Sequence, residues 1–283
     1  MSFDFSKAID STTNPSAYFS GRSEDYENYR PVHPAAAIDA VLAGLAPPPQ
    51  LVAADVGAGT GIGSRLLANR GVKVWAIEPN ADMTQAANLH EGIKFIAGTA
   101  EAIPLENAAV DVVTSFQAFH WFDFTQSLQE FRRVLKPNGR LALIWSLWDQ
   151  RDPVSKDYTR LIFEASQPPE SPTQPRLSVN SWVRRLRYQL FWSGLWLPYF
   201  THFQRREFQF QQQLDLQGLI GLAHSQGFTP SAGEAFEAMI GALSTFRNRH
   251  CNAKSQVQLR YVTRLYLAKS PDRGQPVDVG ERL

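Results

Sequence analysis

Short apolar runs alternate with helical patterns over the first half of the chain. The runs are rich in Val, Ile, Leu and Ala and occupy residues 51–56, 72–78, 93–97, 110–116 and 141–146. Runs that are apolar on both faces are typical of parallel strands covered by helices on both sides of a sheet. Helical periodicity fills residues 34–45, 61–69, 81–89 and 124–135. The pattern predicts a doubly wound α/β domain over residues 34–150.

The pattern changes after residue 150. Residues 167–175 are rich in proline, and residues 181–200 are dense in aromatic side chains and arginine. We interpret residues 151–201 as a helical insertion, or cap, after the fifth strand. Residues 202–214 and 256–268 alternate with period two, which predicts a hairpin-like pair of strands at one sheet edge, with helices at 216–226 and 231–248. We expect residues 202–268 to complete the core, and residues 269–283 to form a flexible tail.

Composition narrows the class of protein. Of 283 residues, 43% are hydrophobic and 19% are charged, which predicts a folded core rather than disorder. Lys and Arg number 28 against 27 Asp and Glu, so the overall charge lacks the basic excess of a dedicated nucleic-acid binder. No apolar run has the length of a membrane span. The single cysteine, Cys251, excludes an internal disulfide and favours a cytoplasmic protein, and the scattered histidines predict no metal site.

A glycine-rich loop follows the first predicted strand and opens a helix. Its sequence, residues 55–61, is DVGAGTG. A strand, glycine loop and helix N-terminus in this order cradle nucleotide-like ligands. The dinucleotide fingerprint requires a glycine five positions after its first one, but Ile62 and Ser64 stand there, so the spacing disfavours NAD. Glu78 ends the second strand, where an acidic side chain can accept hydrogen bonds from both hydroxyls of a ribose.

Together these residues resemble a class I S-adenosylmethionine-dependent methyltransferase of the small-molecule type (methyltransferase type 11). The resemblance spans roughly residues 26–268 and is similar to the trans-aconitate and ubiquinone-pathway group. Besides the glycine loop and Glu78, it rests on YENYRPVHP at 26–34, GTAEAIPLENAAVDVVTSFQAFHWFD at 98–123 and LKPNGRLALIW at 135–145. It implies a Rossmann-like, mostly parallel sheet of seven strands, with residues 1–33 forming an arm over the cofactor.

The resemblance also implies a set of residues that bind S-adenosylmethionine. Gly57, Gly59 and Gly61 would pass under the methionine part, Glu78 would hold the ribose, and Gln117 would lie beside the sulfonium. Thr99 stands where the family usually has aspartate, so the adenine contact would rely on Ala100 and Glu101. The full set of expected cofactor residues is Tyr29, Arg30, Asp55, Gly57, Gly59, Gly61, Glu78, Met83, Thr99, Ala100, Glu101 and Gln117.

His120 is the candidate base or substrate orienter. It lies just beyond the predicted fourth strand and its side chain can titrate near neutral pH. The alternative is that His120, between Phe119 and Trp121, only packs and forms a hydrogen bond. Trp121 and Trp145 have two interpretations as well, either as walls of an apolar acceptor site or as core residues.

Charge is strongly asymmetric in one segment. Residues 171–213 contain six arginines, among them Arg184 and Arg187, and one acidic residue, Glu207. This pattern fits an anionic acceptor bound under a cap, a helix at a lipid surface, or a solvated face.

Small-molecule methylation, on a carboxylate or hydroxyl oxygen, is the leading hypothesis. The alternatives are a nucleic-acid methyltransferase and a non-catalytic cofactor-binding protein with a macromolecular partner.

Overall fold

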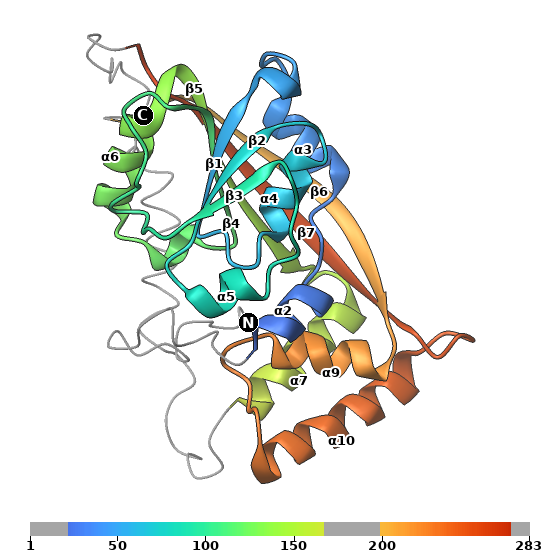
Figure 1. The fold of residues 1–283 in the computed structure, drawn as a ribbon. Helices are drawn as coiled ribbons and strands as arrows, with labels where there is room; N and C mark the ends of the chain where they lie inside the picture. Colours follow the sequence, from blue (N-terminus) through green and yellow to red (C-terminus); the bar gives the residue numbers. More distant parts are fainter. Residues whose placement is uncertain (1–21, 167–198, 273–283) are drawn as a thin grey trace. The chain divides into compact units, whose positions relative to one another are not determined.

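In the computed structural model, the described residues are 22–166 and 199–272. Seven strands form one mixed, mostly parallel sheet in the order β3-β2-β1-β4-β5-β7-β6 (Figure 1). This arrangement confirms the predicted fold class. The order reverses direction at β1 and β4, and ligands of open α/β sheets bind where the strand order reverses in this way.

The first four strands follow the apolar runs within one or two residues. They are β1 (Val52–Val56), β2 (Lys73–Ile77), β3 (Ile93–Ile96) and β4 (Val110–Phe116). All four pair in parallel, and Asp55 on β1 stands opposite Ala76 on β2 and Thr114 on β4. Because parallel strands end at one edge of the sheet, the loops after β1, β2 and β4 emerge at that same edge.

The fifth strand is longer than predicted. β5 (Leu135–Trp148) includes Lys136-Pro137-Asn138-Gly139, which the sequence indicated as a turn before the strand. In the pairing with β4, Leu135 lies opposite Val110 and Arg140 opposite Val112, so these four residues form an irregularity within the strand. Asn138 adopts a φ of 62°, and its N–H donates to the Ser270 carbonyl. The chain beyond the last strand therefore supplies partners that the local sequence does not reveal.

Helices connect these strands much as the periodicity predicts. They are α3 (Ala35–Leu42), α4 (Ile62–Ala68), α5 (Ala81–Gln85) and α6 (Phe124–Val134), with short 3-10 turns η1 (Pro48–Gln50) and η2 (Phe119–Trp121). Asn80 caps α5 and Asp123 caps α6, each accepting a hydrogen bond from a backbone N–H of the first turn. The predicted helix at 81–89 is wrong in length, since α5 ends four residues earlier.

The last two strands lie at one sheet edge, as predicted. They are β6 (Thr201–Leu214) and β7 (Val257–Lys269), and β7 lies between β5 and β6. β6 exposes residues 202–207, including Arg205, Arg206 and Glu207. Charged side chains on an edge strand disfavour pairing with another chain.

The chain packs into two units, and in the described residues their boundaries fall after Arg30 and inside β5, β6 and β7. We call them the core unit, with described residues 31–147, 199–209 and 262–272, and the helical unit, with described residues 22–30, 148–166 and 210–261. In the core unit, α3 and α4 pack on one face of the sheet. Buried side chains of this face include Ile38, Val41, Leu67, Val112 and Ile144. Burial of such side chains is the main source of the unit's stability.

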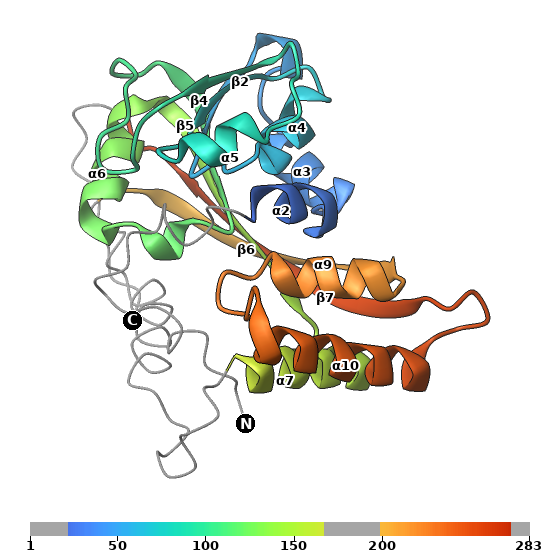
Figure 2. The same ribbon diagram turned by 60° about the horizontal axis from the view of Figure 1, so that its bottom comes forward.

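The helical unit has a hydrophobic core of its own. Its helices are α2 (Ser23–Tyr29), α7 (Pro153–Ala165), α9 (Leu216–His224) and α10 (Gly233–His250). α10 packs against both α7 and α9 (Figure 2). Trp148, Tyr158 and Tyr261 form a buried aromatic group there, and burial raises the pKa of both tyrosines. α7 supplies a helix to the predicted insertion, whose residues 167–198 lie outside the described part.

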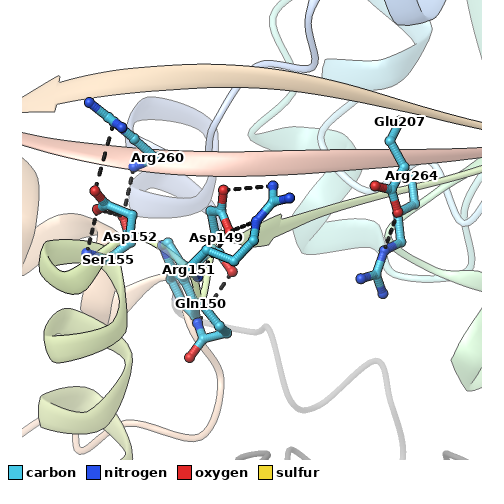
Figure 3. Close-up of polar contacts among 9 residues, drawn as sticks. Asp149, Gln150, Arg151, Asp152, Ser155, Glu207, Arg260 and Arg264 are labelled. Atoms are coloured by element: carbon cyan, nitrogen blue, oxygen red, sulfur yellow. Dashed lines mark hydrogen bonds and ion pairs between the residues drawn. The ribbon is translucent and has the colours of Figure 1, made fainter.

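Polar contacts fasten α7 to the neighbouring strands within the helical unit (Figure 3). Asp152 caps α7 by accepting from the backbone N–H and the hydroxyl of Ser155, at 2.9 and 2.7 Å. The Ser155 hydroxyl in turn accepts from the Arg260 backbone N–H on β7, at 2.7 Å. Within the core unit, Arg264 on β7 forms an ion pair with Glu207 on β6. Among residues 22–166 and 199–272, no helix is both long and apolar enough to cross a membrane.

Candidate functional site

The candidate site is built on the loop between β1 and α4. Gly57, Gly59 and Gly61 have φ angles of 70°, 58° and 79°, a region that side chains disfavour and glycine adopts freely. The backbone N–H groups of Gly57 and Ala58 both donate to the Ile77 carbonyl at the end of β2. The loop is therefore fixed against the neighbouring strand, and α4 begins directly after it.

Glu78 joins this loop to the end of β2. Its carboxylate accepts hydrogen bonds from the backbone N–H of Gly59, at 2.8 Å, and from that of Asn80, at 3.0 Å. Burial raises the pKa of this carboxyl, while the two N–H donors oppose that shift. A carboxylate has about four lone-pair sites, so Glu78 retains the capacity to accept from a pair of ligand hydroxyls.

Asp55 is buried beneath the loop. Its two oxygens accept from the Ser64 hydroxyl, at 2.6 Å, and the Thr114 hydroxyl, at 3.0 Å. Burial raises the pKa of Asp55 to about 6. The side chain thus braces β1 against α4 and β4, and its expected direct contact with a cofactor stays a prediction.

The loop also holds a buried hydroxyl with no hydrogen-bond partner in the described part of the chain. Thr60 is fully buried, and its Oγ1 is unpaired. Buried polar atoms normally have partners, so an unpaired one beside a loop of this geometry indicates a place for a ligand or a water molecule.

The end of β4 lies directly against the glycine loop. A Cβ atom on Gly57 would stand 2.6 Å from the Ala118 Cβ and 2.9 Å from the Phe122 ring. Gln117, with a φ of 57°, pairs its side-chain amide with the backbone of Ser146 on β5, donating at 2.8 Å and accepting at 3.1 Å. The predicted sulfonium-side residue is thus also a clamp between β4 and β5.

His120 lies in η2 and is exposed. Its Nδ1 accepts a hydrogen bond from the Trp145 indole N–H at 3.3 Å, and its ring lies 5.2 Å from the Trp121 ring. Trp145 is 5% exposed and packs edge-on against Phe119 and Tyr266. This burial supports the interpretation of Trp145 as a core residue rather than as a wall of an acceptor site.

The expected adenine-side residues lie after β2 and β3. Met83 on α5 and Ala100 are buried, and Thr99 forms an isolated bridge with Ala102. Glu101 accepts from the Asp123 backbone N–H at 2.8 Å, which ties this segment to the start of α6. The site positions of these residues stay predictions.

Four predicted residues are not among the described residues of the core unit. Tyr29 and Arg30 belong to the helical unit, where Arg30 donates to the Ser225 carbonyl at 2.9 Å. Arg184 and Arg187 lie outside the described residues. Sequence reasoning missed the hydroxyl partners of Asp55. A signal for one of them was present, because Thr114 is a polar residue within an otherwise apolar strand pattern.

The strand order, with a glycine loop and Glu78 at the edge where that order reverses, defines a Rossmann-like fold, and ligands of such folds bind at this edge. The methyltransferase domain family matches residues 54–143. An uncharacterized methyltransferase of Mycobacterium tuberculosis is 34% identical over 176 residues, which are 61% of this chain and 69% of that protein. The chain belongs to the class I S-adenosylmethionine-dependent methyltransferases.

Two further similarities are informative. The malonyl-[acyl-carrier protein] O-methyltransferase of Methylococcus capsulatus is 37% identical over 114 residues, covering 37% of this chain and 41% of that protein. A structure described as a type II methyltransferase from Anaeromyxobacter dehalogenans has a TM-score of 0.56 at 22% identity, covering 86% of this chain and 98% of that one. The second similarity confirms the fold.

The residues of the site fit S-adenosylmethionine, the cofactor of this enzyme class. The three glycines hold the loop in a left-handed conformation without side chains, Thr60 has an unpaired hydroxyl, and Glu78 has acceptor capacity for ribose hydroxyls. When bound, the cofactor supplies a methyl group that its sulfonium already activates. The protein then has mainly to bring an acceptor into line with that methyl group.

Proposed function

We propose that this methyltransferase transfers its methyl group to an oxygen atom of a small-molecule acceptor. The observation that carries the proposal is the packing of the glycine loop on the end of β4. A Cβ atom on Gly57 would stand within 3 Å of Ala118 and Phe122, and the exposed His120 lies between these two residues in the sequence. An acceptor beside His120 therefore reaches the part of the protein that adjoins the cofactor loop.

The name of one relative supports oxygen as the methylated atom. The similar Methylococcus capsulatus protein is an O-methyltransferase. In the proposed mechanism Glu78 holds the ribose, the glycine loop holds the methionine part and His120 orients the acceptor. We further propose that the protein acts in the cytoplasm, on a free acceptor rather than on nucleic acid.

A turnover screen with S-adenosylmethionine tests this proposal. The acceptors are small carboxylic acids, phenols, quinols and amines, and the readout is methylated product by mass spectrometry. We expect product only with oxygen acceptors. Exclusive methylation of amines, or salt-sensitive binding of RNA or DNA followed by its methylation, would overturn the proposal.

The arginine-rich segment leads to a separate prediction about the charge of the acceptor. Six arginines and one glutamate between residues 171 and 213 favour an anionic ligand. We expect Arg184→Ala and Arg187→Ala each to raise the KM for an anionic acceptor several-fold, while the Kd for S-adenosylmethionine stays unchanged. Arg249→Ala, on the helical unit's α10, is the matched control and should leave both constants unchanged. Equal KM values for Arg184→Ala, Arg187→Ala and the parent protein would exclude this role.

A further inference from the structure

Trp145 is held in one position by the core unit. It belongs to β5 and is 5% exposed. Its ring makes edge-to-face contacts with Phe119, at a centroid distance of 6.5 Å, and with Tyr266, at 5.6 Å. Such contacts restrict the rotation of the indole. The direction of its N–H is therefore set by the packing of the core.

That N–H determines which nitrogen of His120 carries a proton. An indole N–H can only donate, and the His120 Nδ1 accepts from it at 3.3 Å. Nδ1 must therefore be unprotonated. Neutral His120 then carries its proton on Nε2, so Nε2 can donate a hydrogen bond and cannot accept a proton.

Hydrogen bonds to the neighbouring backbone hold the segments that carry His120 and Trp145 in place. The Gln117 side chain makes two hydrogen bonds with the backbone of Ser146, the residue after Trp145. The Ser146 hydroxyl is itself within hydrogen-bond distance of His33 Nδ1, at 2.8 Å, and of the Thr263 hydroxyl, at 2.7 Å. The ends of β4 and β5 thus form one fixed frame around His120 and Trp145.

We infer that Trp145 is a positioning residue that fixes His120 as a hydrogen-bond donor through Nε2, and that the acceptor reaches the site with its oxygen already ionised. This inference rests on the proposed function, because it concerns the acceptor beside His120. A base is required only where the acceptor oxygen carries a proton when it arrives. An ionised carboxylate has no such proton, and the Nε2–H group can orient it.

The transfer balances without a proton. A lone pair of the acceptor oxygen forms the new oxygen–carbon bond as the carbon–sulfur bond breaks, and that electron pair returns to sulfur. The anionic oxygen becomes an ester oxygen, and the sulfonium becomes a neutral thioether. No protein residue changes its protonation state.

Nuclear magnetic resonance tests the Trp145 part without any turnover. In protein labelled with ¹⁵N histidine, neutral His120 should show a single Nε2–H tautomer, assigned with His120→Gln. Trp145→Phe should shift the Nδ1 resonance toward a mixture of tautomers, whereas Trp75→Phe, on β2, should leave it unchanged. A proton on Nδ1 in the parent protein would overturn the assignment, even if Trp145→Phe does not fold.

Kinetics test the role of His120. Gln retains an N–H donor but cannot act as a base, so His120→Gln should keep kcat on a carboxylic acid within about tenfold, while His120→Leu should lose more. Removal of a true general base typically costs about 10² to 10⁴ in rate. A loss of that size in His120→Gln would overturn the donor role.

The pH dependence gives a second kinetic readout. At saturating S-adenosylmethionine we expect kcat on a carboxylic acid to stay level between about pH 5.5 and 8, the range in which imidazoles change charge. A tenfold fall per pH unit on the acid side of that range would indicate a base and overturn the inference. If no acceptor of any class is methylated, the proposed function fails, and the tautomer measurement still decides the role of Trp145.

Discussion

At the scale of single residues, Glu78 links the glycine loop to the end of β2 and is the predicted ribose partner. Its carboxylate already accepts from Gly59 and Asn80, so removing it loosens the loop as well as the expected ribose contact. Because hydrogen bonds to a charged acceptor contribute roughly 1.5 to 3 kcal/mol each, Glu78→Ala should raise the Kd for S-adenosylmethionine at least about tenfold. Isothermal titration calorimetry measures the effect. Glu106→Ala, at an exposed position of the same unit, is the control, and an unchanged Kd for Glu78→Ala would remove this residue from the site.

Two buried residues of the core unit, Asp55 and His33, should change the free energy of unfolding in opposite directions as the pH rises. Burial raises the pKa of Asp55 to about 6 and lowers the pKa of His33 to about 4. Between about pH 4 and 6 the folded state binds an extra proton at Asp55, so ionisation of Asp55 destabilises the protein as the pH rises. Over the same range the unfolded state binds an extra proton at His33, so stability from His33 grows as the pH rises.

Single substitutions should separate these two effects. Relative to the parent protein, Asp55→Asn should make the free energy of unfolding rise more steeply with pH between about 4 and 6, by up to about 1.4 kcal/mol per unit. His33→Asn should change the slope by a similar amount in the opposite direction. Urea unfolding at several pH values measures both slopes. Slopes that change in the same direction would contradict the assignment.

At the scale of elements, α4 owes its close approach to the sheet to one glycine. A Cβ on Gly63 would lie 2.2 Å from the Phe116 ring on β4. We expect Gly63→Ala to lower the free energy of unfolding by about 1 to 3 kcal/mol, the usual cost of overpacking. Gly241→Ala, on α10, adds a Cβ with no atom within 4 Å and should stabilise by up to about 1 kcal/mol. Thermal unfolding compares the two, and a stabilised Gly63→Ala would show that the helix can shift.

The elements also show where sequence reasoning succeeds. β1 to β4 were predicted within two residues because strands buried on both faces leave uninterrupted apolar runs. The start of β5 was missed because Asn138 and Gly139 bond to Ser270, more than a hundred residues away in the chain. Glu78 and the glycine loop could be predicted because their positions after two strands are visible in the sequence. The hydrogen bonds of Asp55 with Ser64 and Thr114 could not, because they depend on contacts that form only in the folded protein.

At the scale of the whole molecule, we expect cofactor binding to change amide hydrogen exchange differently in the two units. Adding S-adenosylmethionine should slow amide exchange in residues 57–61 and 78–80, because a ligand covers the backbone there, while α10 keeps its rates. Arg30 docks α2 onto the end of α9, so a cofactor contact by Tyr29 or Arg30 should slow exchange in both helices. Unchanged rates in α2 would remove Tyr29 and Arg30 from the cofactor site, and slower exchange across α10 would contradict a response limited to these elements.

The course of the chain through the two units has a consequence for recombination. Each unit is assembled from three separate stretches of chain, and in the described residues the chain passes between units after Arg30 and at about residues 148, 210 and 261, the last three inside β5, β6 and β7. No single crossover between related genes can therefore exchange the whole helical unit. A chimera would need junctions within strands, where mismatched registers disrupt pairing. We expect the helical unit to diversify by substitution and by loop insertion rather than by modular transfer.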